Sequence, residues 1–313
     1  MRLSAQSDAQ YTQYFAVPAY YNPAVYGNTD YLQIDGAARL QWVGIEGAPK
    51  EFYIGGGLPV VILDKYRIGA GIEIFQESEG LFRTFEASAQ VSYKFPLSKG
   101  YLSVGLQPGI INQSFRGSEI YIPGENGDDS SSQDPDLPVQ DLSGSSFDLG
   151  AGIWYSRENW WIGLSGHHLL SPTVKFKAEN NGQSGSSIEN FEFKAKPSFY
   201  FMTGCNIPIK NTLFEIRPSL LLKHSGNFNT AEVTALVGWK KMFSGGISYR
   251  WNDAVSFILS ADIGGLYIGY SYDYPTSAIA RASKGSHEIV AGYRLKLNLE
   301  KKNKYKYKSI RLM

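Results

Sequence analysis

FRTFEASAQVSYKF, residues 82–95, decides the fold, because from Thr84 onward its polar and apolar side chains alternate without interruption. The odd-numbered positions 85–95 carry Phe, Ala, Ala, Val, Tyr and Phe, and the even-numbered positions 86–94 carry Glu, Ser, Gln, Ser and Lys. Successive side chains of a β-strand point to opposite faces. The stretch therefore predicts a strand with one apolar and one polar face.

The same period recurs along most of the chain, for example in AEVTALVGWK (231–240) and SHEIVAGYRLKLN (286–298). Most of the segments approach the roughly 9–11 residues that a strand needs to cross a bilayer. We therefore expect an all-β fold, a transmembrane antiparallel barrel of about 14 strands. The expected spans are 30–42, 50–58, 65–76, 82–95, 100–112, 145–156, 159–170, 191–205, 212–224, 229–239, 242–251, 254–262, 264–273 and 286–298.

Composition agrees with this class and excludes others. The 313 residues carry a net charge of only +1, so no whole-chain field attracts nucleic acid. Cys205 is the only cysteine, which excludes an internal disulfide framework. The longest apolar run, LPVVIL at 58–63, is far below the ~18 residues of a transmembrane helix, which leaves strands as the way to span a membrane.

Connection lengths separate the two ends of the expected barrel. Three connections are long, 113–144, 171–190 and 274–285, and all fall at one end, whereas the other end has mostly short turns. Outer-membrane barrels have long extracellular loops and short periplasmic turns, and an even number of strands places both termini on the periplasmic side. The acidic stretch 124–136 lacks EF-hand spacing and is interpreted as a solvated loop.

The two faces of the strands differ in a way that favours a barrel over a sandwich. Charged side chains would be costly in a sandwich core but are ordinary in a wet or cross-linked lumen. Aromatic residues gather near strand ends, which is typical of interfacial girdles. The expected inward charges are Arg39, Glu73, Glu86, Lys94, Asp148, Glu215, Arg217, Glu232, Arg250, Asp262, Glu288 and Arg294, and the expected girdle includes Trp42, Trp154, Trp160, Trp161, Trp239 and Trp251.

The expected organisation has three parts. Residues 1–29 form an N-terminal periplasmic arm, in which 1–5 could be a signal-peptide remnant or an ordinary N-terminus. Residues 30–298 form the barrel. Residues 299–313 form a basic periplasmic tail, either a solvated end or a contact for an acidic partner or peptidoglycan.

Motifs of catalysis are missing from the sequence. It contains no GxSxG, P-loop, nucleotide fingerprint or HExxH, and no nucleophile can be paired with a base. His167 and His168 are adjacent, so in a strand they would point to opposite faces and are expected to be structural or interfacial residues rather than joint metal ligands. We expect no enzymatic activity, catalytic residue, cofactor or metal.

Three N-terminal motifs carry a resemblance to a known family. DAQYTQYF (8–15), YNPAVYG (21–27) and QWVGIEGAP (41–49), followed in order by fragments as far as the terminal GSHEIVAGY, resemble the PorP/SprF family of type IX secretion outer-membrane proteins. The resemblance covers nearly the whole chain. Tyr26 departs from the family, in which a small residue is common at this position.

The resemblance implies an integral protein of the Gram-negative outer membrane without enzymatic activity. Its implied role is to dock or anchor exported proteins, such as surface adhesins with C-terminal sorting domains, and to contact other secretion and gliding components. The expected partners are those proteins and outer-membrane lipid. The candidate structural or partner-binding residues are Tyr21, Asn22, Pro23, Ala24, Gly27, Gln41, Trp42, Gly44, Gly47, Ala48 and Pro49.

The two groups of candidate residues have different expected roles. The Asn22-Pro23 step favours a turn that tucks the arm against or inside the lumen. Gln41-Trp42 is expected to close the first strand, and residues 44–49 to form the first outer loop. Gly44 and Gly47 permit backbone angles that other residues avoid, and Pro49 stiffens the exit. Packing and partner binding both remain open for these motifs.

A channel for small solutes is the alternative function, because a barrel of this size is wide enough for a pore if nothing fills it. The similar numbers of inward Glu and Arg favour a cross-linked interior, but the sequence does not pair them. A surface enzyme is the third and least favoured option.

Overall fold

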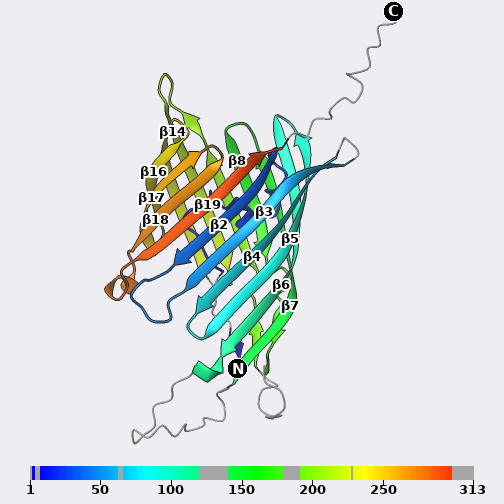
Figure 1. Cartoon of the computed structure of the whole chain (residues 1–313), viewed down its shortest axis with the longest axis vertical. Helices are drawn as coiled ribbons and strands as arrows, with labels where there is room; N and C mark the ends of the chain where they lie inside the picture. Colours follow the sequence, from blue (N-terminus) through cyan, green and yellow to red (C-terminus); the bar gives the residue numbers. More distant parts are fainter. Residues whose placement is uncertain are drawn as a thin grey trace, which may run out of the picture.

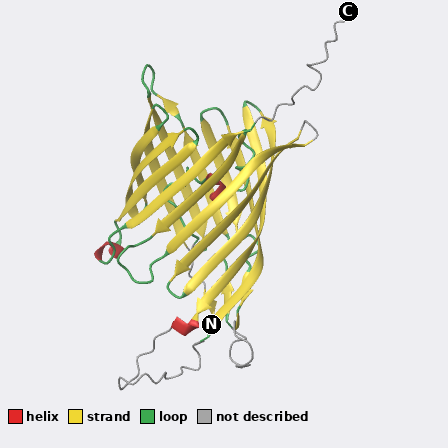
Figure 2. Ribbon diagram, viewed as in Figure 1, coloured by secondary structure: helices red, strands yellow, loops and turns green. Residues whose placement is uncertain are grey.

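The chain folds into a closed antiparallel barrel of 14 strands, as expected (Figures 1 and 2). The computed structural model describes residues 2–3, 8–62, 66–119, 140–178, 191–226 and 228–297. The barrel strands are β2 (Tyr31–Leu40), β3 (Lys50–Ile62), β4 (Tyr66–Glu79), β5 (Phe82–Leu97), β6 (Gly100–Arg116), β7 (Asp141–Ser156), β8 (Trp160–His167), β12 (Ser198–Cys205), β14 (Phe214–Ser225), β15 (Phe228–Trp239), β16 (Phe243–Arg250), β17 (Ala254–Ile263), β18 (Leu266–Pro275) and β19 (Ser286–Lys296).

Each barrel strand pairs with the one before it in the barrel, and the circle is closed between the last strand and the first. In that closing pair, Glu288 of β19 lies opposite Arg39 of β2. Closure satisfies the backbone groups that an open sheet would leave unpaired at its edges, which is a requirement inside a bilayer.

Several predicted strand boundaries are wrong: β3, β4 and β6 end three to four residues later than predicted, β7 begins four residues earlier, and β8 ends three residues earlier. Two further differences concern the span 191–205 and the end of the first strand. The span 191–205 is divided into β11 (Glu192–Lys194) and β12, and β11 joins β9 (Thr173–Lys175) and β1 (Arg2–Leu3) in a separate small sheet. The first barrel strand ends at Leu40, so Gln41 and Trp42 belong to the loop. The remaining short elements are β10 (Lys177–Ala178), β13 (Ile207–Pro208), α1 (Pro18–Tyr21), η1 (Gly117–Glu119) and η2 (Ala278–Arg281).

Apolar side chains cover the outside of the barrel, and polar side chains fill the inside. Ile72 and Leu259 are each 67% exposed, whereas Glu232 is 0% exposed. This reversal of a soluble protein's pattern is expected for a barrel that faces lipid. Six of the charges expected to point inward are buried: Arg39, Glu73, Glu215, Glu232, Arg250 and Glu288.

Two tryptophans of the expected girdle lie elsewhere. Trp154 is 6% exposed, and its ring stacks on Trp161 with the centroids 4.6 Å apart. Both rings pack against buried residues of the N-terminal segment, so they belong to the interior.

The two ends of the barrel differ, as Figure 1 shows. One end, here called the long-loop end, carries η1, η2 and the small sheet, and the other, the short-turn end, carries the tight turns. The acidic stretch 124–136 and the basic tail 299–313 lie outside the described residues. No helix in the described ranges is long and apolar enough to cross a membrane.

The N-terminal segment runs through the barrel. Residues 8–30, here called the plug, enter beside Gly69 near the short-turn end and reach His168, at the long-loop end of β8. Arg2 and Leu3 continue to β11 of the small sheet. From residue 8 onward the arm lies inside the lumen, one of the two positions expected from the Asn22-Pro23 turn. Residues 2–3 lie at the long-loop end, whereas both termini were expected at the short-turn end.

Candidate functional site

The plug sits on a buried charge network that belongs to the barrel wall. Arg39 pairs with Asp273 at 2.7 Å and with Glu288 at 3.1 Å. The backbone N–H groups of Thr12 and Gln13 donate to the two carboxylate oxygens of Glu288 at 2.7 and 2.9 Å. The plug backbone therefore supplies hydrogen-bond donors to a buried carboxylate of the barrel wall.

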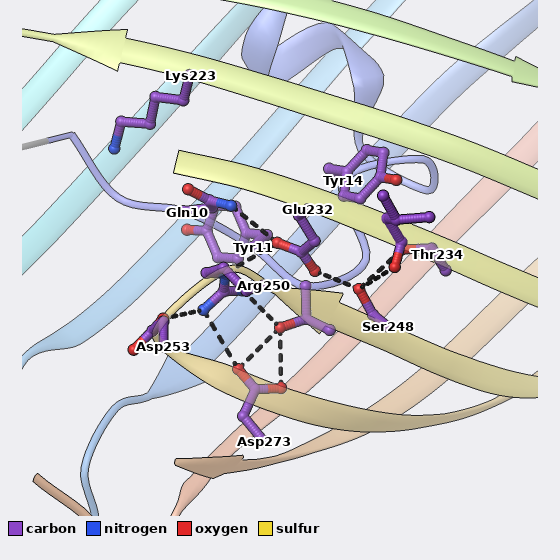
Figure 3. A network of polar contacts seen from close by, with 12 residues as sticks. Gln10, Tyr11, Tyr14, Lys223, Glu232, Thr234, Ser248, Arg250, Asp253 and Asp273 are labelled. Atoms are coloured by element: carbon purple, nitrogen blue, oxygen red, sulfur yellow. Dashed lines mark hydrogen bonds and ion pairs between the residues drawn. The ribbon is translucent and has the colours of Figure 1, made fainter. Parts of the chain in front are cut away.

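A second guanidinium extends this network across β15 and β16 (Figure 3). Arg250 pairs with Glu232 at 2.9 Å, with Asp253 at 3.0 Å and with Asp273 at 3.6 Å. The side-chain amide of Gln10 donates to Glu232 at 2.8 Å. Both ends of the network thus receive donors from the plug.

Charge counting explains why the plug is needed there. The fully buried part of the network holds three carboxylates, Asp273, Glu288 and Glu232, against two guanidiniums, Arg39 and Arg250. Buried charges cost several kcal/mol each unless their hydrogen-bonding capacity is filled. The N–H groups of the plug donate the hydrogen bonds that two guanidiniums cannot provide to three carboxylates. The plug and the wall therefore stabilise each other.

An aromatic cluster holds the middle of the plug. The cluster includes Tyr20 of the short helix α1. This helix begins with Pro18, and proline fits the first helical turn because no amide donor is needed there. The ring of Tyr20 lies 5.1 Å from both Tyr11 and Tyr53 and 5.6 Å from Phe75, measured between centroids. Such edge-on and tilted pairs add stability beyond the buried area.

Tyr21, the first candidate residue, is fully buried in this region. Its hydroxyl accepts the backbone N–H of Tyr11 at 2.8 Å. Its carbonyl oxygen accepts the Ser165 hydroxyl at 2.6 Å and lies 3.0 Å from His167 Nε2. The predicted structural role of His167 is consistent with this contact.

The Asn22-Pro23-Ala24 turn is clamped between β7 and β8. The Asn22 side-chain amide donates to the carbonyl oxygens of Ile153 and Leu164 at 3.0 and 3.3 Å, while its own oxygen accepts the N–H of Ala24 at 2.9 Å. A Cβ added to Gly152 would lie 2.3 Å from that oxygen. The turn therefore fits because the wall is glycine at the point of contact.

Tyr26 and Gly27 close the plug near the short-turn end. A Cβ added to Gly57 or Gly71 would lie 2.4 or 2.3 Å from the ring of Tyr26. Gly27 has φ +84° and accepts the Arg67 Nε–H at 2.8 Å through its carbonyl oxygen. The large residue that departs from the family pattern thus occupies a cradle made by glycines of β3 and β4.

The second group of candidates forms the first outer loop, away from the plug. The Gln41 N–H donates to Pro49 O at 3.0 Å, which closes the loop, and Gly80 N–H donates to Gly47 O at 2.8 Å. Gly44 and Gly47 have φ angles of +101° and +70°, which are the backbone angles that glycine was expected to permit here. Gln41, Gly44, Gly47, Ala48 and Pro49 line a cavity of about 510 Å³ at the outer rim, and Trp42 stands beside it with φ +48°.

Sequence reasoning missed most of the plug residues that touch the network. Gln10, Thr12 and Gln13 lie in the quoted motif DAQYTQYF, but the motif has no strand or helix period that would place them. Within the described part of the chain, no group of three or more His, Cys, Asp or Glu side chains is placed to hold a metal ion.

A hollow of about 380 Å³ faces the short-turn end. Its lining includes Phe15 of the plug with Arg217, Asp262 and Arg294 of the wall. Arg217 pairs with Glu215, while Arg294 and Asp262 are 4.0 Å apart. The polar lining of this hollow suits water or a hydrophilic partner segment.

Solved structures with similar shape are outer-membrane proteins of very different sequence. The Pseudomonas putida toluene transporter TodX is 9% identical, with 90% of this chain and 93% of that chain covered and a TM-score of 0.49. The Ralstonia pickettii toluene transporter TbuX is 9% identical, with 90% and 94% covered and a TM-score of 0.46. Omp33 of Acinetobacter baumannii is 7% identical, with 86% and 100% covered and a TM-score of 0.44.

A search of curated proteins found no match. The family comparison matches residues 3–293 to the family described as "Type IX secretion system membrane protein PorP/SprF". The match spans the plug and all of the barrel except the last three residues of β19, and it includes both groups of candidate residues. The chain belongs to the PorP/SprF family of type IX secretion system membrane proteins.

Proposed function

We propose that this barrel is a non-enzymatic docking component of type IX secretion. It holds exported proteins, such as adhesins with C-terminal sorting domains, at the cell surface and contacts the secretion and gliding machinery. Membership of the family supports the secretion role. Docking requires a rigid surface at each end of the barrel. A filled lumen makes the barrel rigid because the plug is bonded to strands around the wall.

The filled lumen is the observation that carries this proposal. Tyr11, Thr12 and Gln13 of the plug are each 0% exposed inside the barrel. They are bonded to wall residues on β18 and β19 and packed against β3. A solute channel would instead need an open, wet path at this level. The occupied interior therefore favours a scaffold over the channel alternative.

The two ends offer different surfaces to partners. The long-loop end presents the first outer loop and the rim cavity to the cell exterior, which suits an exported protein. The short-turn end presents tight turns and the polar hollow to the periplasm, which suits a component of the machine.

Comparing the surface and supernatant proteins of cells with and without this gene tests the proposal. Loss of one large adhesin indicates a dedicated anchor, and joint loss of many exported proteins with periplasmic accumulation indicates a general component. An unchanged set of proteins contradicts the secretion role. Hydrolase activity of the purified barrel would contradict the non-enzymatic part.

A further inference from the structure

A row of polar and basic side chains crosses four strands on the outer surface of the barrel at the long-loop end. Lys50 lies opposite Ser78, Ser78 opposite Arg83, and Arg83 opposite Ser114. Adjacent strands are about 4.8 Å apart, so the Cα atoms of Lys50 and Arg83 are roughly 10 Å apart. The row faces outward because its sequence neighbours are buried in the lumen: Glu51, Glu77, Thr84 and Gln113.

Two further rows below it define its depth in the membrane. The next outward row lies two residues further along each strand, which is about 5 Å deeper because barrel strands are tilted by about 40°. It consists of Phe52, Gln76, Phe85 and Asn112. The row after that consists of Ile54, Ile74, Ala87 and Ile110. The first row is basic and polar, the second carries aromatic and amide side chains, and the third is aliphatic. This order matches the change from lipid headgroups to hydrocarbon. The basic row therefore lies at the headgroup end of this gradient, with its ends at somewhat different depths because the strands are tilted.

The rim cavity opens beside this row. Its lining contains three basic side chains, Lys50, Arg83 and Arg116, and one acidic side chain, Glu46. Arg116 is paired with Glu119. Within the described ranges, no ion pair engages Lys50 or Arg83, and both are exposed. Two cations at headgroup level are thus available to an anion from the membrane.

We propose that this rim site binds the phosphate groups of an anionic glycolipid of the outer leaflet. The long-loop end faces the cell exterior, so the lipid beside it belongs to that leaflet. Arginine binds phosphate through two parallel hydrogen bonds, lysine adds a point charge, and the hydroxyls of Ser78 and Ser114 are donors between and beside them. The lipid chains then lie along the aliphatic rows below. The first outer loop roofs the site, so a bound headgroup would order the same loop that faces partners.

Lipid binding to the full-length protein in nanodiscs tests this assignment. The probes are bisphosphorylated lipid A and its dephosphorylated form, counted by native mass spectrometry. The test variant is K50Q/R83Q, and the matched control K210Q/K240Q removes two cations from the short-turn end. A surface cation contributes about 1 kcal/mol to binding an anionic lipid, so K50Q/R83Q should bind the bisphosphorylated form about 30-fold more weakly. The control should bind it as the wild type does.

Several results would overturn the proposal. K50Q/R83Q could retain full affinity, or the control could lose as much as the test variant. Dephosphorylated lipid A could bind the wild type equally well. Displacement of the lipid by excess inorganic phosphate alone would indicate a free-anion site, and displacement by an acidic peptide would indicate a protein site. Unchanged heat-modifiable migration in gels verifies that each variant is folded.

Discussion

The backbone N–H of Thr12 donates a 2.7 Å hydrogen bond to Glu288 Oε2, although 276 positions separate the two residues. Gln13 donates to the other oxygen at 2.9 Å, and Arg39 pairs with the same carboxylate at 3.1 Å. The Glu288 side chain therefore joins the last barrel strand to both the plug and the first barrel strand. The plug and the closure of the barrel depend on the same group.

Replacing Glu288 with alanine should destabilise the barrel and loosen its plug. The change leaves the Arg39 charge and two plug N–H groups without this acceptor, and breaking a buried pair from one side costs about 3–5 kcal/mol. We expect a lower urea midpoint in lipid vesicles and faster proteolysis of residues 8–30. E288Q keeps an acceptor of the same shape, so it should lie between E288A and the wild type.

The matched control for this prediction is D262N. Asp262 also pairs with an arginine of the lumen, because its carboxylate lies 4.0 Å from the Arg294 guanidinium. The side chains of Asp262 and Arg294 are, however, 39% and 38% exposed. An exposed pair contributes less than about 1 kcal/mol. Equal losses of stability in E288A and D262N would mean that the buried network is not what seats the plug.

Gly71→Ala should displace the lower part of the plug. The added Cβ would lie 2.3 Å from the Tyr26 ring, an overlap that costs about 1–3 kcal/mol in a packed interior. The unfolding free energy of G71A in lipid vesicles measures this cost. The control is G36A, whose Cβ has its nearest neighbour 3.5 Å away.

The Tyr26 ring is the predicted source of that cost, and a double-mutant cycle isolates it. In a Y26A background the two ring contacts of the G71A Cβ are gone and only its 3.1 Å contact with Gly56 O remains, so most of the penalty should disappear. An undiminished penalty in Y26A would place the strain in the strand itself rather than in the contact with the plug.

Period-two alternation was enough to predict the barrel, because it is set residue by residue within each strand. The spans of β5 and β17 were predicted almost to the residue, and the inward direction of Arg39 and Glu288 followed from the same period. The span 191–205 failed because its alternation continues through a break at Ala195–Pro197, where the chain leaves β11 for β12.

The plug could not be predicted in the same way. Residues 8–30 have no regular period, and their partners lie up to 276 positions away. The Asn22-Pro23 step indicated a turn, but only the register of β7 and β8 places the two carbonyl oxygens that Asn22 needs. Trp154 and Trp161 were assigned to a girdle because sequence does not distinguish rings that face lipid from rings that face a plug.

Planar-bilayer recordings should find the wild-type barrel closed, without large stable conductance. The physical reason is the plug, whose Thr12 and Gln13 are 0% exposed. E288A should give intermittent openings, because it weakens the seat of the plug without removing a strand. Stable wild-type conductance would move the solute-channel function ahead of the scaffold.

Thiol labelling in intact cells should verify which end faces the exterior. In a C205S background, E46C places a thiol on the first outer loop, and K210C places one on a short turn; both positions are exposed. A membrane-impermeant maleimide should label E46C in intact cells and K210C only after the outer membrane is permeabilised, because long loops face outward in outer-membrane barrels. The reverse labelling would invert the barrel. The rim site would then face the inner leaflet, and the surfaces proposed for exported proteins and for the machine would exchange places.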